Sequence, residues 1–188
     1  MFKDLDLEAH PGLLKLLKEG ETLEDFLKQS KDKILIRWFN YHLERSELDH
    51  DPITNLGKDV ADGTAYTVLL NQLDKSRCDA TGLEDDEDTR CQKVLDNAEE
   101  IGATKFLTTP HEITCGNKRL NMLFTASIYN AKPGLEDVDE REAYAKIINY
   151  ALKDDPVCAP DVPINPDDDS LFESLDNGIV LWYMLRDV

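Results

Sequence analysis

Histidine, cysteine and clustered acidic residues are the side chains of this chain that could hold a metal ion or take part in catalysis. The four histidines and four cysteines form no C-x-x-C pair and show no zinc-site spacing, and no glycine-rich phosphate-binding motif is present. The acidic runs at 84–88 and 167–169 lack the alternating ligands and central glycine of a calcium loop. We therefore predict no enzyme activity, no cofactor and no metal site.

Single histidine and tryptophan residues have structural interpretations instead. His42 lies on or beside the apolar face of a predicted helix, which favours a partly buried, hydrogen-bonded histidine over a ligand. Trp38 and Trp182 are expected at core and boundary positions, because stacking on nucleic-acid bases would have no electrostatic support in so acidic a chain.

The charge balance argues against two classes of partner. The chain has 188 residues, of which 21 are Lys or Arg and 39 are Asp or Glu, so its net charge is −18. Such a chain repels nucleic acid and anionic membrane surfaces, and no apolar run is long enough to span a membrane. The N-terminus lacks a signal-peptide pattern and the cysteines are expected to stay reduced, so we predict a cytoplasmic location.

Apolar residues recur at helical spacing along most of the chain, which predicts an all-α fold. Pro11 is suited to begin an early helix, Thr22 with Asp25 resembles a capping box, and Ser30 can cap the first long helix. Four principal helices are expected within 31–131, with apolar faces around 34–43, 66–73, 91–101 and 120–128.

The helical pattern then begins a second time. Asn40-Tyr41 matches Asn149-Tyr150 at an offset of 109, and Asp62-Gly63 matches Asn177-Gly178 at an offset of 115. A repeat of this length predicts two copies of one domain rather than a solenoid. The second copy contains counterparts of only the first half of the domain, and half of a helical core leaves its apolar face uncovered.

Several segments together resemble the calponin-homology domain, and specifically the fimbrin/plastin family. These are LEAHPGLLKLL at 7–17, ILIRWFNYHL at 34–43 and GNKRLNMLF at 116–124, which resemble the second domain of that family. PINP at 163–166 and DNGIVL at 176–181 resemble the first domain instead. We therefore expect an N-terminal helical linker segment at 1–30, a second-type domain at 31–133, a linker at 134–141 and a partial first-type domain at 142–188.

The resemblance implies a calponin-homology fold of four principal helices plus short connecting helices, followed by an incomplete second copy. It also implies a non-enzymatic protein that binds and crosslinks actin filaments. In the family the first-type domain contributes most of the affinity, and the first helix of the second-type domain assists. Carried onto this sequence, the resemblance makes the following basic residues candidates for filament contact: Lys33, Arg37, Arg45, Lys146 and Lys153.

Two alternatives remain open at this point. Calponin-homology domains also occur in scaffolds on microtubules or the ciliary axoneme, which would place the protein in the cilium rather than the actin cytoskeleton. The candidate residues could also be solvated positions on helix surfaces. Residues 136–188 carry 14 acidic and 4 basic residues, a net of −10. A neighbouring calponin-homology domain or another basic partner is therefore expected to cover 142–188.

Overall fold

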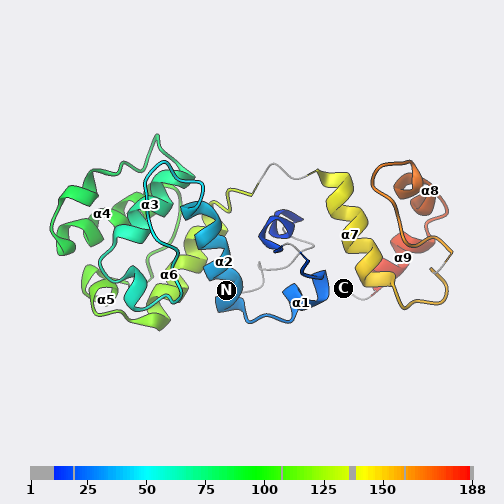
Figure 1. Cartoon of the computed structure of the whole chain (residues 1–188), viewed down its shortest axis with the longest axis horizontal. Helices are drawn as coiled ribbons and strands as arrows, with labels where there is room; N and C mark the ends of the chain where they lie inside the picture. The colour runs from blue at the N-terminus through cyan, green and yellow to red at the C-terminus, as the bar shows by residue number, and fades with distance from the viewer. Residues whose placement is uncertain (1–10, 19, 107, 136–138, 159, 187–188) are drawn as a thin grey trace. The chain divides into compact units, whose positions relative to one another are not determined.

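The computed structural model describes residues 11–18, 20–106, 108–135, 139–158 and 160–186, and these form helices without any strand (Figure 1). They divide into two compact units, which are described separately below. Unit 1 consists of residues 29–134, and unit 2 consists of the described residues of 11–28 and 135–186. The predicted all-α fold is confirmed. None of the described helices is both long and apolar enough to cross a membrane.

Unit 1 contains the four principal helices that the apolar spacing predicts. Shorter helices connect them, and α5 begins with Pro110 directly after its capping residue Thr109. In chain order the described helices of unit 1 are α2 (Lys31–Leu43), η2 (Lys58–Val60), α3 (Thr64–Leu73), η3 (Thr81–Glu84), α4 (Glu87–Glu100), α5 (Pro110–Thr114) and α6 (Lys118–Ala131), where η denotes a 3-10 helix.

Aromatic side chains from three helices form the centre of unit 1. Trp38 on α2 packs edge-on against Tyr129 on α6, with ring centroids 5.3 Å apart. Tyr66 on α3 lies between Phe39 and Phe124, at 5.5 and 5.2 Å. All five rings are completely buried. The Tyr66 hydroxyl lies 2.9 Å from Thr125 Oγ1 on α6, so α6 both covers α3 and satisfies its buried polar group.

The chain that leaves α6 is held against α2 through one carbonyl. The Trp38 indole Nε1 donates to the Pro133 oxygen at 2.7 Å, and His42 Nε2 lies 2.9 Å from the same oxygen. Gly134 follows with a φ of +63°, and a Cβ there would lie 2.7 Å from the His42 ring. His42 is therefore a buried, hydrogen-bonded structural residue, as its position on the helix predicts.

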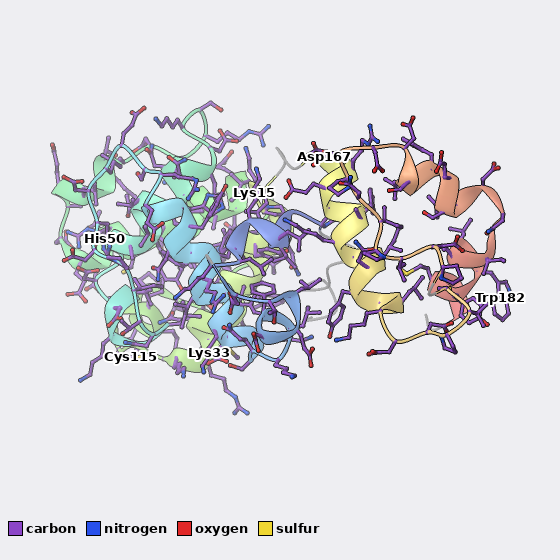
Figure 2. The ribbon with its side chains drawn as sticks, turned by 45° about the vertical axis from the view of Figure 1, so that its right-hand side comes forward. Lys15, Lys33, His50, Cys115, Asp167 and Trp182 are labelled. Atoms are coloured by element: carbon purple, nitrogen blue, oxygen red, sulfur yellow. The ribbon has the colours of Figure 1, made fainter. Side chains whose placement is uncertain are left out.

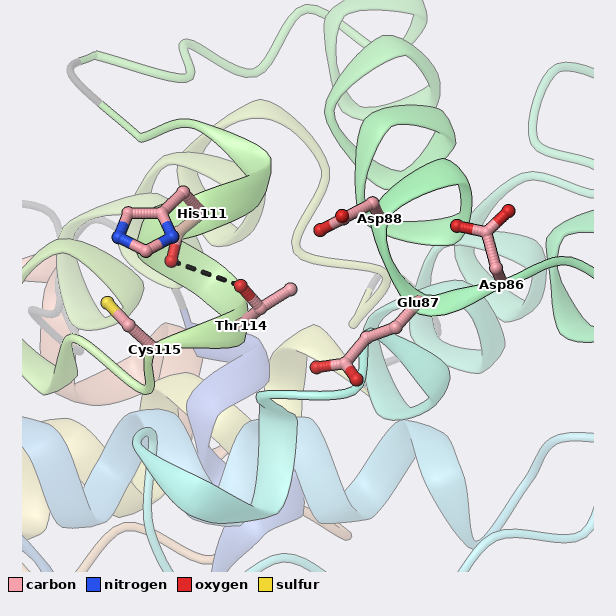
Figure 3. A pocket seen from close by; sticks show the side chains of 6 residues that line it. All are labelled: Asp86, Glu87, Asp88, His111, Thr114 and Cys115. Atoms are coloured by element: carbon pink, nitrogen blue, oxygen red, sulfur yellow. Dashed lines mark hydrogen bonds between the residues drawn. The ribbon is translucent and has the colours of Figure 1, made fainter.

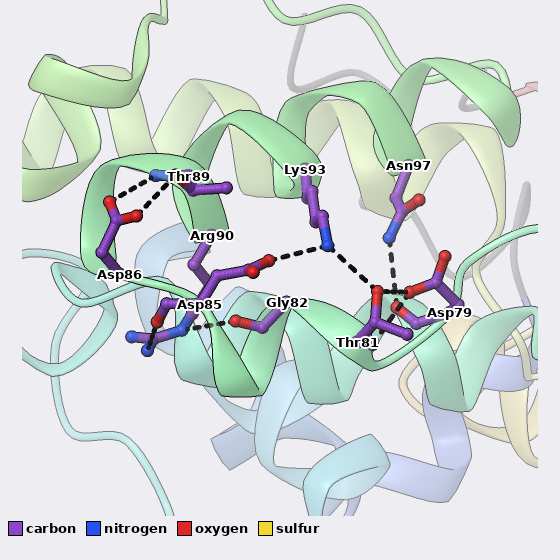
Figure 4. Close-up of polar contacts among 9 residues, drawn as sticks. All are labelled: Asp79, Thr81, Gly82, Asp85, Asp86, Thr89, Arg90, Lys93 and Asn97. Carbon is purple, nitrogen blue, oxygen red and sulfur yellow. Dashed lines mark hydrogen bonds and ion pairs between the residues drawn. The ribbon is translucent and has the colours of Figure 1, made fainter.

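One arginine joins two segments at the start of α4, the residues before α3 and the η3 turn (Figure 4 shows the contacts with the η3 turn). Arg90 donates to the backbone oxygens of Asp62, Gly82 and Asp85 at 2.7, 3.0 and 2.8 Å. On the next turn of α4, Lys93 forms an ion pair with Asp85 at 2.7 Å. Part of the acidic run at 84–88 therefore has a structural role within the fold.

Unit 2 combines two segments that are distant in sequence. Its described helices are η1 (Pro11–Leu16), α1 (Leu23–Leu27), α7 (Glu140–Leu152), α8 (Ser170–Asp176) and α9 (Ile179–Arg186). The helix predicted after Pro11 is a 3-10 helix, and it packs against α7. Gly12 allows η1 to lie close to Leu135, since a Cβ at Gly12 would lie 2.6 Å from the Leu135 oxygen.

Of the two helix caps predicted from the sequence, Thr22 is confirmed and Ser30 is confirmed only in position. Thr22 caps α1, with its Oγ1 accepting from Asp25 N at 3.1 Å and donating to the Asp25 carboxylate at 2.7 Å. Ser30 occupies the N-cap position of α2, but its side chain accepts no bond from the helix backbone. The Ser30 hydroxyl bonds to the Asp32 carboxylate instead, which lowers the pKa of Asp32.

The internal repeat is visible in the hydrogen bonds. In unit 1 the Asn40 side chain donates to the Ile53 oxygen and accepts from the Ile53 N–H, both at 2.8 Å. In unit 2 Asn149 makes the same two bonds with Ile164, at 2.8 and 2.6 Å. The offsets of 109 and 115 differ by six, so the second copy has six extra residues between its two matched positions. The hydrogen-bonded partners are 13 residues apart in unit 1 and 15 in unit 2, so two of these six residues lie in this loop. The other four lie before Asn177, where α8 replaces the short η2.

Trp182 differs from its predicted core or boundary position, because 59% of its surface is exposed. Figure 2 shows it projecting from α9. The offset of 115 makes Thr67 on α3 its counterpart, and Thr67 is buried in unit 1, where α4 packs on α3. The described residues of unit 2 contain no counterpart of α4, which explains the exposure.

The division into a linker segment at 1–30, a domain at 31–133, a linker at 134–141 and a partial domain at 142–188 stays a prediction. Residues 1–10 of the first segment and 136–138 of the second linker lie outside the described residues. Within the described residues, 11–28 pack with the C-terminal segment rather than forming a separate body.

Candidate functional site

Three of the predicted contact residues belong to α2 and the turn that follows it: Lys33 and Arg37 lie on the helix, and Arg45 comes directly after the C-cap Glu44. Their spacings of four and eight residues place them in one row along the surface of the helix and the turn that continues it. Lys33 and Arg45 are exposed and Arg37 is half-buried (Lys33 is labelled in Figure 2). We call this row, together with Tyr41, the α2 basic row.

Tyr41 fills the remaining step of the row, and sequence reasoning missed it. The Arg45 guanidinium carbon lies 3.5 Å above the Tyr41 ring centroid, and Arg45 Nη1 donates to the Tyr41 oxygen at 3.1 Å. Both contacts hold the cation at the C-terminal end of α2, where the helix dipole favours positive charge. The four-residue spacing of 33, 37, 41 and 45 was the available signal.

The remaining two candidates, Lys146 and Lys153, lie on α7 or at its C-cap in unit 2. The offset of 109 places Lys146 at the position of Arg37 and Tyr150 at that of Tyr41. Lys153 Nζ lies 4.9 Å from the Tyr150 ring centroid, which repeats the cation–aromatic contact of α2. However, Glu142 occupies the position of Lys33 and Asp154 that of Arg45, while Lys153 lies one residue earlier, so the repeat keeps the cation–aromatic contact but not the row of positive charges.

Both lysines of unit 2 are engaged in ion pairs. Lys146 Nζ lies 2.6 Å from the Glu142 carboxylate, one helical turn away. Lys153 Nζ lies 2.9 Å from the Glu24 carboxylate on α1, which also contacts Lys28 at 2.7 Å. Hydrogen bonds from Lys28 and Lys153, with their positive charges, lower the pKa of Glu24 to about 2. The same contact raises the pKa of Lys153.

Replacing Lys153 with alanine is expected to raise the pKa of Glu24 from about 2 toward its ordinary value of 4.5, with Lys28 retaining part of the shift. A carboxylate whose pKa is lower in the folded than in the unfolded protein stabilises the fold at pH values above the unfolded-state pKa. For Glu24 this stabilisation is lost as the pH falls from 4.5 to about 2. An NMR titration of the Glu24 carboxyl carbon measures the shift. Lys146→Ala is the control and should leave that titration unchanged; an unchanged Glu24 in Lys153→Ala would contradict the pairing.

A hollow lies between the start of α4 and α5 (Figure 3). His111, Thr114 and Cys115 line one side, with Asp88 and Glu87 on the other. The side chain of Asp86, beside them, accepts from the Thr89 N–H at 3.1 Å and so caps α4. Within the described residues, no group of three His, Cys, Asp or Glu side chains is placed to hold a metal ion. The hollow carries no recognisable chemistry beyond that cap.

The four cysteines fall into two classes. Cys78, Cys91 and Cys158 are buried, whereas Cys115 is exposed. Burial is the main cause that raises the pKa of Cys78 to about 11 and that of Cys91 to about 12. The buried thiols pack as small core side chains.

The comparison with known protein families decides the identity of unit 1. The family model described as the calponin homology (CH) domain matches residues 29–134. The chain belongs to the calponin homology family. The match covers the whole of unit 1, including the α2 basic row and the Pro133 carbonyl that holds α6 to α2.

The similar proteins are fimbrins and plastins. Saccharomyces cerevisiae fimbrin is 37% identical over 194 residues, which cover 96% of this chain and 29% of that protein. Schizosaccharomyces pombe fimbrin is 45% identical over 139 residues, 73% of this chain and 22% of that protein. The crystal structure of the actin-crosslinking core of the latter matches with a TM-score of 0.57 and 42% identity, over 73% of this chain and 30% of that one. The predicted fold and the resemblance to this family are confirmed, and the chain spans less than a third of these fimbrins.

Proposed function

We propose that this chain is a non-enzymatic, actin-binding part of a filament-crosslinking protein, and that the α2 basic row contacts the filament. The observation that carries the proposal is the match to the actin-crosslinking core of a fimbrin, at 42% identity. The proposal also places the protein in the actin cytoskeleton. Lys146 and Lys153 on α7 are proposed as secondary contacts, because their ion pairs with Glu142 and Glu24 reduce their net charge toward a partner.

Electrostatics supports the α2 basic row as the principal contact. Unit 1 has 13 basic and 18 acidic residues, a net charge of −5, so the row is a local exception in an acidic body. An actin filament is itself acidic, and long-range repulsion slows association while local opposite charges set the orientation. We therefore expect weak binding that weakens further as salt is added, since exposed charges are screened.

The microtubule or axonemal alternative has no comparable support. The relatives described above are fimbrins and plastins, and the solved structure concerns actin crosslinking. No contact in the described residues favours a microtubule partner over actin.

The direct test is cosedimentation of the 188-residue protein with actin filaments at low salt, with microtubules as a parallel sample. Combining Lys33→Glu, Arg37→Glu and Arg45→Glu is expected to weaken binding to actin at least about tenfold, since each exposed ion pair contributes on the order of 0.5 kcal/mol and reversal adds repulsion. The measurement is the bound fraction against actin concentration.

A matched variant separates the row from net charge. Lys58→Glu, Lys75→Glu and Arg77→Glu change the charge equally at exposed positions of unit 1 outside α2, and should bind nearly as the unchanged protein does. Equal weakening of both variants would show that only overall charge matters. Pelleting with microtubules but not with actin would reject the proposed function.

A further inference from the structure

The charges of unit 1 are distributed unevenly between its helices. Residues 79–100, which include η3 and α4, carry nine acidic and two basic residues, a net charge of −7. The rest of unit 1 carries nine acidic and eleven basic residues, a net charge of +2. α3 packs against both α2 and α4, and Figure 1 shows it between them. Unit 1 therefore has an acidic side at α4 and a locally basic side at α2.

The start of α6 belongs to the basic side as well. Lys118 and Arg119 are the first two residues of α6, and both are exposed. Lys118 Nζ lies 4.0 Å from the Asp32 carboxylate, and Asp32 directly precedes Lys33 on α2. Because α2 and α6 also pack against each other, their first turns form one continuous part of the surface.

The acidic side chains at this surface are engaged, whereas two of its cations are not. The Ser30 hydroxyl and, more weakly, the charge of Lys118 lower the pKa of Asp32. Glu112 of α5 accepts from the Asn117 amide at 2.5 Å. Within the part of the chain that the structure describes, neither Lys33 nor Arg119 has an ion-pair partner. These two charges are therefore available to an acidic partner.

We propose that Lys118 and Arg119 of α6 join Lys33 and Arg37 of α2 in one surface that contacts the acidic actin filament, with the α4 side turned away from it. This inference rests on the proposed function and extends the contact from one helix to two. An acidic partner is repelled by residues 79–100 and attracted by the first turns of α2 and α6, so the uneven charge of unit 1 selects its orientation on the filament.

The test is cosedimentation of the 188-residue protein with actin filaments at about 0.1 M salt, where the screening length of about 10 Å makes charge effects local. Combining Lys118→Glu and Arg119→Glu is expected to weaken binding about three- to tenfold, because two exposed attractions become repulsions. Acidic residues in a first turn are favourable to the helix dipole, so α6 should be retained, which thermal unfolding followed by circular dichroism checks.

The matched control combines Lys75→Glu and Arg77→Glu. These are the same residue types at exposed positions of unit 1 outside α2 and α6, and this variant should bind nearly as the unchanged protein does. If the Lys118 and Arg119 variant binds as the unchanged protein does, or if both variants are weakened equally, this inference is overturned and the proposed function stands. Absence of actin binding by the unchanged protein would overturn both.

A change in the opposite direction separates this surface from damage to the fold. Asp32→Asn removes the negative charge between Lys33 and Lys118 and should strengthen binding about twofold. Asp96→Asn makes the same change at an exposed position of α4 and should leave binding unchanged, because that side is turned away from the filament. Equal strengthening by the two substitutions would show that only net charge matters, and would overturn the inference.

Discussion

Replacing Trp38 with alanine is expected to lower the free energy of unfolding of unit 1 by about 3–5 kcal/mol, the range for a large ring removed from a packed core. The indole is completely buried and packs on Tyr129, 5.3 Å between centroids. Its Nε1 also donates to the Pro133 oxygen at 2.7 Å, so the substitution removes packing and one of the two bonds that hold the chain after α6. Urea denaturation followed by circular dichroism measures the loss.

Two further variants divide this effect into its parts. Trp38→Phe keeps most of the ring and removes the hydrogen bond, so a smaller loss of about 1–2 kcal/mol is expected. Trp182→Ala removes an equally large ring that is 59% exposed and should change the free energy by less than about 0.5 kcal/mol. Similar losses for Trp38→Ala and Trp182→Ala would contradict the assignment of core and surface.

Replacing Arg90 with alanine is expected to cost about 2–4 kcal/mol, because three hydrogen bonds from a charged donor to backbone oxygens are lost together. These bonds join the residues before α3 to η3 and its C-cap Asp85, directly before the α4 cap. Thermal unfolding of unit 1 and amide hydrogen exchange around 82–85 measure the result.

Arg90→Lys tests the geometry of this contact. Lysine keeps the charge but cannot direct three donors along the fork of a guanidinium group, so most of the loss should remain. Arg77→Ala removes an exposed arginine of the same unit and should be nearly neutral. A lysine variant as stable as the unchanged protein would show that charge alone matters at this position.

Local patterns predicted the helices well, because helix spacing and caps depend on neighbours within a few residues. The apolar faces in 31–131, the Thr22 cap and the glycine before α3 all follow this rule. The shared contacts of Asn40 and Asn149 explain why a repeat was visible in the sequence. Each asparagine side chain forms hydrogen bonds with both backbone groups of one buried isoleucine in the following loop. The family resemblance extended these local predictions to a complete fold.

Contacts between distant residues could not be predicted in the same way. Glu24 and Lys153 are 129 residues apart, and neither flanking sequence indicates the other. The three acceptors of Arg90 are backbone oxygens, which every sequence supplies, so no residue type marks them. For the candidate site, the resemblance supplied the row of cations, while the contribution of Tyr41 required the position of the Arg45 guanidinium above its ring.

The distribution of the thiols has a practical consequence for spectroscopy. All four cysteines lie within the described residues, and Cys115 alone among them is exposed. A maleimide reagent applied to the folded protein can therefore attach one fluorophore or spin label at the end of α5 without any substitution. That position lies in unit 1, so the label reports on the calponin homology domain.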